Sequence, residues 1–125
     1  MRYVWVMGVF ICCAFVQTAQ ANTLHCAQEI EHGRASWYGP RFEGKPTASG
    51  ELFYPTKFSA AHPTLPFGTV LKVVNLSNNR DVVVEVNDRG NFASMNRVID
   101  LSEAAAIELG MKRKGIAKVA VFSCN

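Results

Sequence analysis

Three polar side chains in separate segments are of types that suit acid–base chemistry. Glu51 ends the small polar segment Thr47-Ala-Ser-Gly-Glu51, His62 precedes a proline, and Asp88 lies within Asn87-Asp-Arg-Gly90. Two carboxyl groups and an imidazole on rigid elements are able to protonate a leaving group and later accept a proton. Each also has a purely structural interpretation: a solvated loop charge, a turn histidine and an Asx-type turn. Spacing alone does not bring the three together.

The element that must position Asp88 is the stretch Asp81 to Gly90. Three valines at alternate positions from 82 to 86 predict a strand with one buried face. We expect this strand to deliver Asn87, Asp88 and Arg89 to its end. A Gly-terminated turn there is a good mount for a carboxylic acid beside a substrate.

The other predicted elements are short. Strands are expected at residues 33–39, 69–75, 98–101 and 116–122, with a hairpin turn at Asn78-Asn79. Ser102 should cap a helix that ends at Gly110. Residues 22–32 form a polar lead-in, and residues 40–67 hold all five prolines without regular periodicity, which indicates a functional loop system. The pattern favours a small closed β-barrel.

The first 21 residues have the features of a signal peptide. Arg2 gives a positive start, residues 4–16 are apolar, and Ala19-Gln-Ala21 is a small-x-small cleavage site. Thirteen apolar residues are short of the ~20 that a spanning helix needs, so we favour cleavage over an uncleaved anchor. We therefore expect a mature domain of residues 22–125, periplasmic or secreted.

The composition, with 49% hydrophobic and 18% charged residues, is that of one folded domain. Without Arg2 the chain has 12 Lys and Arg against 10 Asp and Glu, and this net charge of +2 is too weak to indicate a nucleic-acid partner. Cys12 and Cys13 lie in the leader, so Cys26 and Cys124 most simply form one disulfide. No metal or other cofactor is expected, because three scattered histidines and two distant cysteines lack ligand spacing.

Five motifs carry a resemblance to a known family. In order they are Ala35-Ser-Trp-Tyr-Gly39, Thr47 to Glu51, Ala60-Ala-His62 with Leu65-Pro-Phe-Gly68, Asn87 to Gly90, and Arg97-Val-Ile-Asp-Leu-Ser102. From about residue 33 to 122 the sequence resembles the rare lipoprotein A (RlpA) family. The resemblance implies a mainly β fold, a six-stranded double-psi β-barrel with one or two short helices. It also implies lytic transglycosylase activity on peptidoglycan glycan strands that lack stem peptides.

The resemblance also implies roles for single residues. It places the catalytic acid on Asp88 and the family's two other important positions on Glu51 and His62. Asp88 would protonate the glycosidic oxygen and then deprotonate the muramic C6 hydroxyl, which requires it to hold a proton through burial or a nearby like charge such as Glu51. Arg89 is expected to turn aside, toward Asp100 or a substrate carboxylate. Expected substrate-binding residues are Tyr38, our first choice for stacking on a sugar ring, with Thr47, Ser49, Asn87 and Arg89.

The sequence departs from the family pattern at several points, and we consider two alternative functions. Asn91 replaces the usual proline, no lipidation box precedes Cys26, and the chain ends at Asn125, so we expect neither a lipid anchor nor the C-terminal peptidoglycan-binding domain of longer members. A monomer is expected. One alternative is a non-catalytic, expansin-like glycan-binding module. Another is an inverting hydrolase that pairs Asp88 with Asp100 or Glu51, at a carboxyl separation of roughly 6.5 to 9.5 Å.

Overall fold

The computed structural model describes residues 24–92 and 95–124. The predicted signal peptide, its cleavage site after Ala21, and Cys12 and Cys13 lie outside the described residues. Among the residues described, no helix has the length and apolar character needed to span a membrane.

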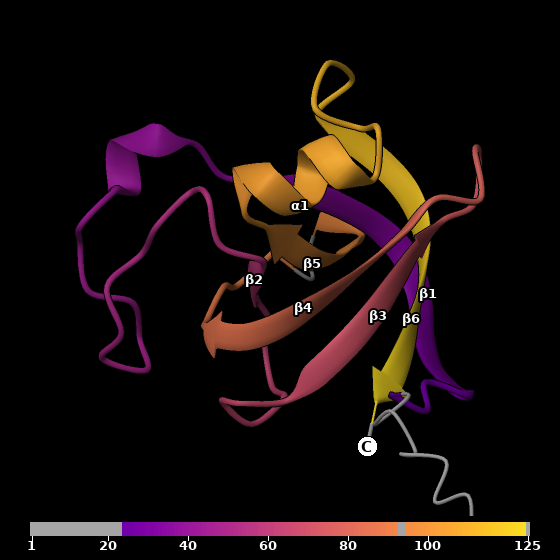
Figure 1. Ribbon diagram of the computed structural model, residues 1–125, viewed down its shortest axis with the longest axis horizontal. Coiled ribbons are helices and arrows are strands. Elements are labelled where there is room, and N and C mark those ends of the chain that lie inside the picture. Colours follow the sequence, from indigo (N-terminus) through magenta and orange to yellow (C-terminus); the bar gives the residue numbers. More distant parts are fainter. Residues whose placement is uncertain (1–23, 93–94, 125) are drawn as a thin grey trace, which may run out of the picture.

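Six strands form a closed barrel in the order β1-β5-β2-β4-β3-β6 (Figure 1). They are β1 Gln28–Trp37, β2 Ser59–Ala61, β3 Val70–Asn75, β4 Asp81–Asp88, β5 Arg97–Leu101 and β6 Ile116–Cys124. The pairs β1–β5 and β2–β4 are parallel, and the other four neighbouring pairs are antiparallel. The predicted mainly β barrel is confirmed.

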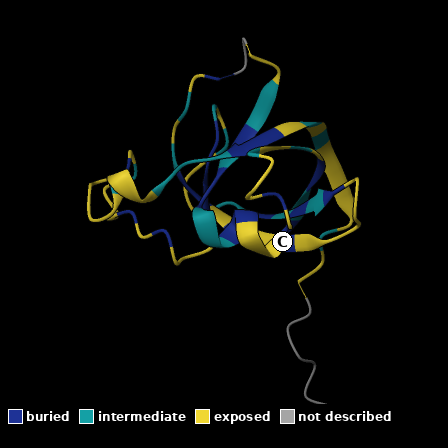
Figure 2. Ribbon diagram, turned by 90° about the horizontal axis from the view of Figure 1, so that it is seen from above, coloured by how far each residue is buried: buried dark blue, intermediate teal, exposed yellow. Residues whose placement is uncertain are grey.

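The core fills the inside of this barrel (Figure 2). Along β4 the side chains at 82, 84 and 86 are buried while those at 81, 83 and 85 are exposed, as their alternation predicted. Leu71 and Val73 of β3 and Val119 and Val121 of β6 are fully buried against them. Close packing of branched side chains from opposing strands gives β4 a rigid base.

The short helix α1, Glu103–Glu108, begins and ends where the sequence predicted. The Ser102 hydroxyl accepts a hydrogen bond from the Ala105 N–H, and Gly110 has a φ of +68° that suits a helix C-terminus. Ala105 and Leu109 are buried in the barrel core. A second helical turn, η1, covers Pro40–Phe42.

Two strand predictions were incomplete. β1 begins at Gln28 rather than at residue 33, because residues 28–32 pair through their backbone with β6 although most of their side chains are exposed. Such a segment has no apolar alternation to detect. β2, at Ser59–Ala61, lies inside the stretch expected to be irregular; it is too short, and its side chains too small, to show a strand pattern.

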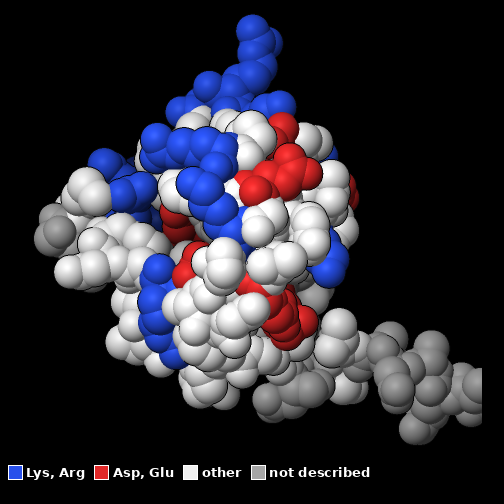
Figure 3. All heavy atoms as spheres, turned by 90° about the vertical axis from the view of Figure 1, so that its left-hand side faces the viewer, with Lys and Arg blue, Asp and Glu red and all other residues white. Residues whose placement is uncertain are grey.

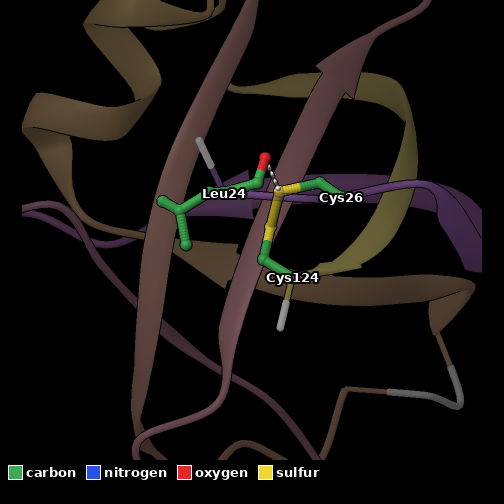
Figure 4. The surroundings of a disulfide bond; sticks show 3 residues. All are labelled: Leu24, Cys26 and Cys124. Atoms are coloured by element: carbon green, nitrogen blue, oxygen red, sulfur yellow. Dashed lines mark hydrogen bonds between the residues drawn. A yellow bond between two sulfur atoms is a disulfide. The ribbon is translucent and has the colours of Figure 1, made fainter. Parts of the chain in front are cut away.

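The predicted disulfide between Cys26 and Cys124 is confirmed (Figure 4). It joins the segment just before β1 to the end of β6, across a sequence separation of 98 residues. It therefore links β1 and β6, the first and the last strand along the chain, which also pair with each other.

Candidate active site

One row of four residues crosses four neighbouring strands. Ser36 on β1 pairs with Asp100 on β5, Asp100 pairs with Ala61 on β2, and Ala61 pairs with Asp88 on β4. Directly paired residues in a sheet present their side chains to the same face. The barrel thus brings two carboxyl groups, 12 residues apart in sequence, to either side of one alanine.

A β-bulge in β4 makes this arrangement possible. Ala60 pairs with Val86 and Ala61 pairs with Asp88, so Asn87 is an extra residue in β4. Val86 and Ala60 are both in the core cluster. Because the extra residue shifts the register, Asp88 joins Ala61 on the face that points away from the core.

A cavity of about 220 Å³ covers this part of the row. Its floor is formed by Ala61, Asp88 and Asp100, and its walls come from the 38–53 segment and the turn after β4. The wall residues are Tyr38, Phe42, Lys45, Pro46, Thr47, Phe53, Arg89 and Gly90. On this side of the molecule acidic atoms lie among Lys and Arg side chains (Figure 3).

The Asp88 carboxylate is held by backbone donors. Its Oδ1 accepts hydrogen bonds from the N–H of Ala48 at 3.0 Å and from the N–H of Arg89 at 2.9 Å. Two N–H groups directed at one oxygen fix the plane of the carboxyl group. A proton on this side chain would therefore reside on Oδ2.

Asp100 is the second acid of the cavity. Burial raises its pKa, the Ser36 hydrogen bond and the nearby Arg97 charge oppose that rise, and the Asp88 charge adds to it. The Arg97 guanidinium donates to Ser36 Oγ at 2.8 Å, and Ser36 Oγ donates to Asp100 Oδ1 at 2.8 Å. Asp100 is thus more easily protonated than an exposed aspartate.

Tyr38 lies beside both acids. Burial raises the pKa of its hydroxyl, and the negative charges of Asp88 and Asp100 raise it further, so Tyr38 is a neutral donor at physiological pH. The Ser59 side chain lies close enough to lower this pKa slightly, but the buried hydroxyl oxygen forms no hydrogen bond of good geometry with any described residue. The ring packs on Phe53 with centroids 4.6 Å apart, so one of its faces is covered and is not available for stacking on a sugar.

Glu51 is not in the Asp88 cavity. Its Oε2 accepts a hydrogen bond from Asn87 Nδ2 at 3.3 Å, and both residues line a neighbouring cavity. Asn87 and Asp88, adjacent in the bulge, thus line different cavities, and Glu51 belongs to the one that Asn87 lines.

Thr47 and Ser49 shape the loop that separates the two cavities. Thr47 Oγ1 donates to the Glu51 carbonyl at 2.8 Å and lies 2.9 Å from Ser49 Oγ. The Ser49 N–H donates to the Asn87 carbonyl at 3.2 Å. Thr47 lines the Asp88 cavity, whereas Ser49 does not. Both hydroxyls are committed to the loop, so their first role is to hold it against β4.

His62 is buried and fully bonded outside the cavity. Its Nδ1 accepts from the N–H groups of Thr64 and Leu65 at 3.1 and 3.0 Å, so the ring proton is on Nε2, which donates to Glu31 Oε1 at 2.5 Å. The His62 N–H donates to the Asp88 carbonyl at 3.1 Å. The side chain thus supports the turn beside Asp88 and does not face the carboxyl group.

Arg89 turns away from the Asp88 carboxylate, as predicted, but toward neither expected partner. Its guanidinium lies over the Phe67 ring, 4.1 Å from the centroid, and its Nη1 is 3.4 Å from the carbonyl oxygens of His62 and Asp88. It still lines the cavity. A cation is therefore available at the rim without neutralising the acid.

Sequence reasoning left several cavity residues out of the site. Asp100 was considered only as a possible partner, Ala61 appeared only within a family motif, and Lys45 was not considered. The register across β5, β2 and β4 identifies Asp100 and Ala61, and no local motif reports that register. Among the described residues no group of three or more His, Cys, Asp or Glu side chains could hold a metal ion.

The barrel with an acidic cavity on its outer face defines a class of protein. It is similar to the Streptomyces papain inhibitor, with a TM-score of 0.61 and 22% identity over 79% of this chain and 96% of that one. It is also similar to a mutant Clavibacter michiganensis expansin in complex with cellohexaose, with a TM-score of 0.58 and 22% identity over 75% of this chain and 50% of that one. The fold is thus an expansin-like double-psi β-barrel.

Sequence comparison then gives the family. Residues 30–121 match the Lytic transglycolase family model. A probable endolytic peptidoglycan transglycosylase RlpA of Synechocystis is 50% identical over 111 residues, and the Campylobacter jejuni endolytic peptidoglycan transglycosylase RlpA is 52% identical over 97 residues. The chain belongs to the RlpA family of lytic transglycosylase domains.

The relatives are longer proteins. These matches cover 86% and 78% of this chain but only 34% and 35% of the Synechocystis and Campylobacter proteins. The chain thus spans about a third of the length of the relatives it matches.

Proposed function

We propose that this chain is an exported endolytic lytic transglycosylase that cleaves peptidoglycan glycan strands lacking stem peptides. The observation that carries the proposal is the Asp88 carboxyl group, whose Oδ1 is fixed by two backbone N–H groups at the floor of a cavity. The family relationship supports the reaction class, and the fixed carboxyl group in the cavity supports Asp88 as the acid.

Asp88 acts first as an acid and then as a base. Protonated Oδ2 gives its proton to the glycosidic oxygen while the bond from that oxygen to C1 of the muramic residue breaks. The resulting carboxylate then removes the proton from the C6 hydroxyl of the same sugar, and the C6 oxygen bonds to C1. The products are a free hydroxyl on the leaving sugar and a 1,6-anhydromuramic end, and Asp88 is again protonated.

The other cavity residues assist this cycle. Asp100 places a second carboxyl group near the reacting sugar, where it can stabilise positive charge that develops at C1. The unpaired Tyr38 hydroxyl can donate to a substrate oxygen, and Lys45 and Arg89 offer cations at the rim. Glu51 acts indirectly by fixing Asn87, and His62 acts by supporting the turn, so both are positioning residues.

A second candidate function is an inverting hydrolase, favoured by the placement of Asp88 and Asp100. Two strand spacings of 4.7–4.9 Å put their Cα atoms about 10 Å apart with both side chains on one face. Carboxyl groups that converge slightly from there would fall in the range that leaves room for a water. The similarity of the fold to an expansin supports a third candidate function, non-catalytic glycan binding.

One digestion experiment distinguishes the three candidate functions. Purified mature protein is incubated with amidase-treated glycan strands, and the products are analysed by mass spectrometry. Anhydromuramic ends support the transglycosylase, reducing ends support the hydrolase, and intact strands retained by the protein support binding alone. Export is tested separately, by fusing residues 1–21 to a reporter that is active only outside the cytoplasm.

A further inference from the structure

A second cavity, of about 410 Å³, lies next to the one that holds Asp88. It is lined by Glu51, Leu52, Tyr54, Lys57, Phe58, Ser59, Glu85 and Asn87. Ser59 pairs with Glu85 in this cavity, and Ala61 pairs with Asp88 in the first one. Two residues along β2 span about 7 Å, so the cavities are neighbours on the same outer face.

The loop from Thr47 to Glu51 forms a ridge between the two cavities. Hydrogen bonds from the Ala48 N–H to Asp88 Oδ1 and from the Ser49 N–H to the Asn87 carbonyl tie it to the end of β4. Thr47 faces the first cavity and Glu51 the second. An extended ligand that leaves the first cavity over this ridge enters the second.

Asn87 supplies an unsatisfied acceptor in the second cavity. The residue is 6% exposed, and its Oδ1 is buried with no hydrogen-bond partner among the described residues. The Nδ2 group donates to Glu51 Oε2, so flipping the amide would set a carbonyl against a carboxylate. An unpaired buried acceptor is costly, and a ligand N–H or O–H would relieve that cost.

The same pattern recurs in both cavities. Among the described residues, the buried side-chain N and O atoms without a partner are Tyr38 Oη and Asn87 Oδ1. The first belongs to the Asp88 cavity and the second to its neighbour. Each cavity thus offers one unsatisfied polar group, a donor beside the acids and an acceptor across the ridge.

Exposed rings complete the second cavity. Phe58 is 50% exposed and Tyr54 is 38% exposed, and the Lys57 ammonium lies 5.1 Å from the centroid of the Tyr54 ring. Rings with free surface pack against the apolar faces of sugars, while Glu51 and Lys57 can accept from and donate to sugar hydroxyls. The combination suits an N-acetylated sugar, whose acetamido N–H would reach Asn87 Oδ1.

We infer that this second cavity is a subsite for the same glycan strand, binding an N-acetylated sugar next to the one at Asp88. The inference rests on the proposed function, because it takes its ligand from there. It predicts that strands long enough to cross the ridge bind more tightly than short ones, and that Tyr54 and Phe58 produce the difference.

The test uses the Asp88→Asn protein, so that bound strands stay intact. Calorimetry measures the affinity for the peptide-free glycan disaccharide, which fills only the two positions flanking the scissile bond at Asp88, and for the octasaccharide. Adding Tyr54→Ala with Phe58→Ala should weaken octasaccharide binding about tenfold and leave disaccharide binding unchanged. Leu76→Ala, which removes an exposed apolar side chain from a different cavity, is the matched control and should change neither. Circular dichroism checks that every variant is folded.

A second readout follows Asn87 directly. Octasaccharide should shift the Asn87 side-chain amide resonances in an NMR spectrum, and the disaccharide should not. The subsite would be overturned if Tyr54→Ala with Phe58→Ala left the affinity for both oligosaccharides unchanged. It would also be overturned if the two substitutions weakened the binding of both oligosaccharides equally. A change from dimer to monomer without a change in glycan affinity would overturn it too, since the rings would then cover a second copy. Failure of Asp88→Asn to bind either oligosaccharide would instead overturn the proposed function.

Discussion

Asp88 and Asp100 flank Ala61, each paired with it from a neighbouring strand, so that two acids from segments 12 residues apart share one face of the barrel. They differ in how they are held. Asp88 Oδ1 accepts from two backbone N–H groups, whereas Asp100 Oδ1 accepts from the Ser36 hydroxyl. The different settings suit different roles in one reaction.

Asp88→Asn should abolish cleavage with little effect on the fold. The amide oxygen can still accept from Ala48 and Arg89, but the group can no longer give and take a proton. General acid–base groups contribute about 10²- to 10⁴-fold to a rate, and the loss should fall in or above this range. Mass spectrometry of digested strands measures it, and cleavage that persists at the wild-type rate would remove Asp88 from the role.

Asp100→Asn discriminates the two cleaving candidates. In a hydrolase Asp100 would be the base that activates water, so its loss should be as severe as that of Asp88. In a transglycosylase Asp88 performs both proton transfers, and the variant should retain anhydromuramic product at a reduced rate. Product type and rate are read from the same digest.

Asp100 should also make stability depend on pH. Burial raises its pKa in the folded state above that in the unfolded chain, so the folded state binds more protons between those two values. The favourable contribution is present below the unfolded pKa and is lost as pH rises through the folded pKa. Asp100→Asn should therefore raise Tm relative to wild type at pH 7. The gap should close as pH falls below about 4, and thermal scans across pH would show it.

Gly90→Ala should damage the site through Phe92. A Cβ at residue 90 would lie 2.1 Å from Phe92 Cε1, too close to be accommodated without moving the ring. We expect a loss of about 1–3 kcal/mol in the free energy of unfolding and a fall in cleavage rate, because Gly90 lines the Asp88 cavity. Gly39→Ala is the control: its Cβ would meet only Trp37, at 3.9 Å, so stability and rate should be nearly unchanged.

Two His62 variants separate support from catalysis. His62→Ala leaves the N–H groups of Thr64 and Leu65 without their acceptor, and should destabilise the protein by about 1–3 kcal/mol. His62→Asn offers an oxygen near the position of Nδ1 and should recover much of the stability and the cleavage rate. Should His62→Asn be fully folded yet inactive, the imidazole itself would be needed in the reaction.

Removal of the disulfide should cost about 2–5 kcal/mol in the free energy of unfolding. The Cys26–Cys124 bridge closes almost the whole described chain, and a long loop gives the unfolded state more freedom once it is cut. Denaturant unfolding of the double Cys→Ala variant measures the change. An unfolding midpoint equal to that of wild type would mean that pairing between β1 and β6 suffices alone.

The sequence was most informative where apolar periodicity and local turn chemistry agree. The valines of β4, the Ser102 cap, and the positive φ of Asn79 and Gly110 all follow from local rules. β2 escaped prediction because three small residues carry no periodic signal. The strand pattern indicated a small closed barrel, and the order of the five motifs, read as a family resemblance, supplied its six strands and double-psi topology.

The site was harder to predict, because a single extra residue decides it. Simple alternation from Val86 would send Asp88 toward the core, and the bulge at Asn87 moves it to the outer face. That same shift places Asp88 in one row with Asp100, on either side of Ala61. A bulge depends on pairing between strands distant in sequence, so no motif within β4 reports it.

The Cys26–Cys124 bridge also determines how the domain would respond to mechanical tension. A pulling force applied at these two residues passes through a covalent sulfur–sulfur bond and leaves the strands between them unloaded. The acidic row across β1, β5, β2 and β4 would then keep its geometry under that force. Under reducing conditions the same pull would peel β1 from β6 first, because those strands adjoin the two anchor points.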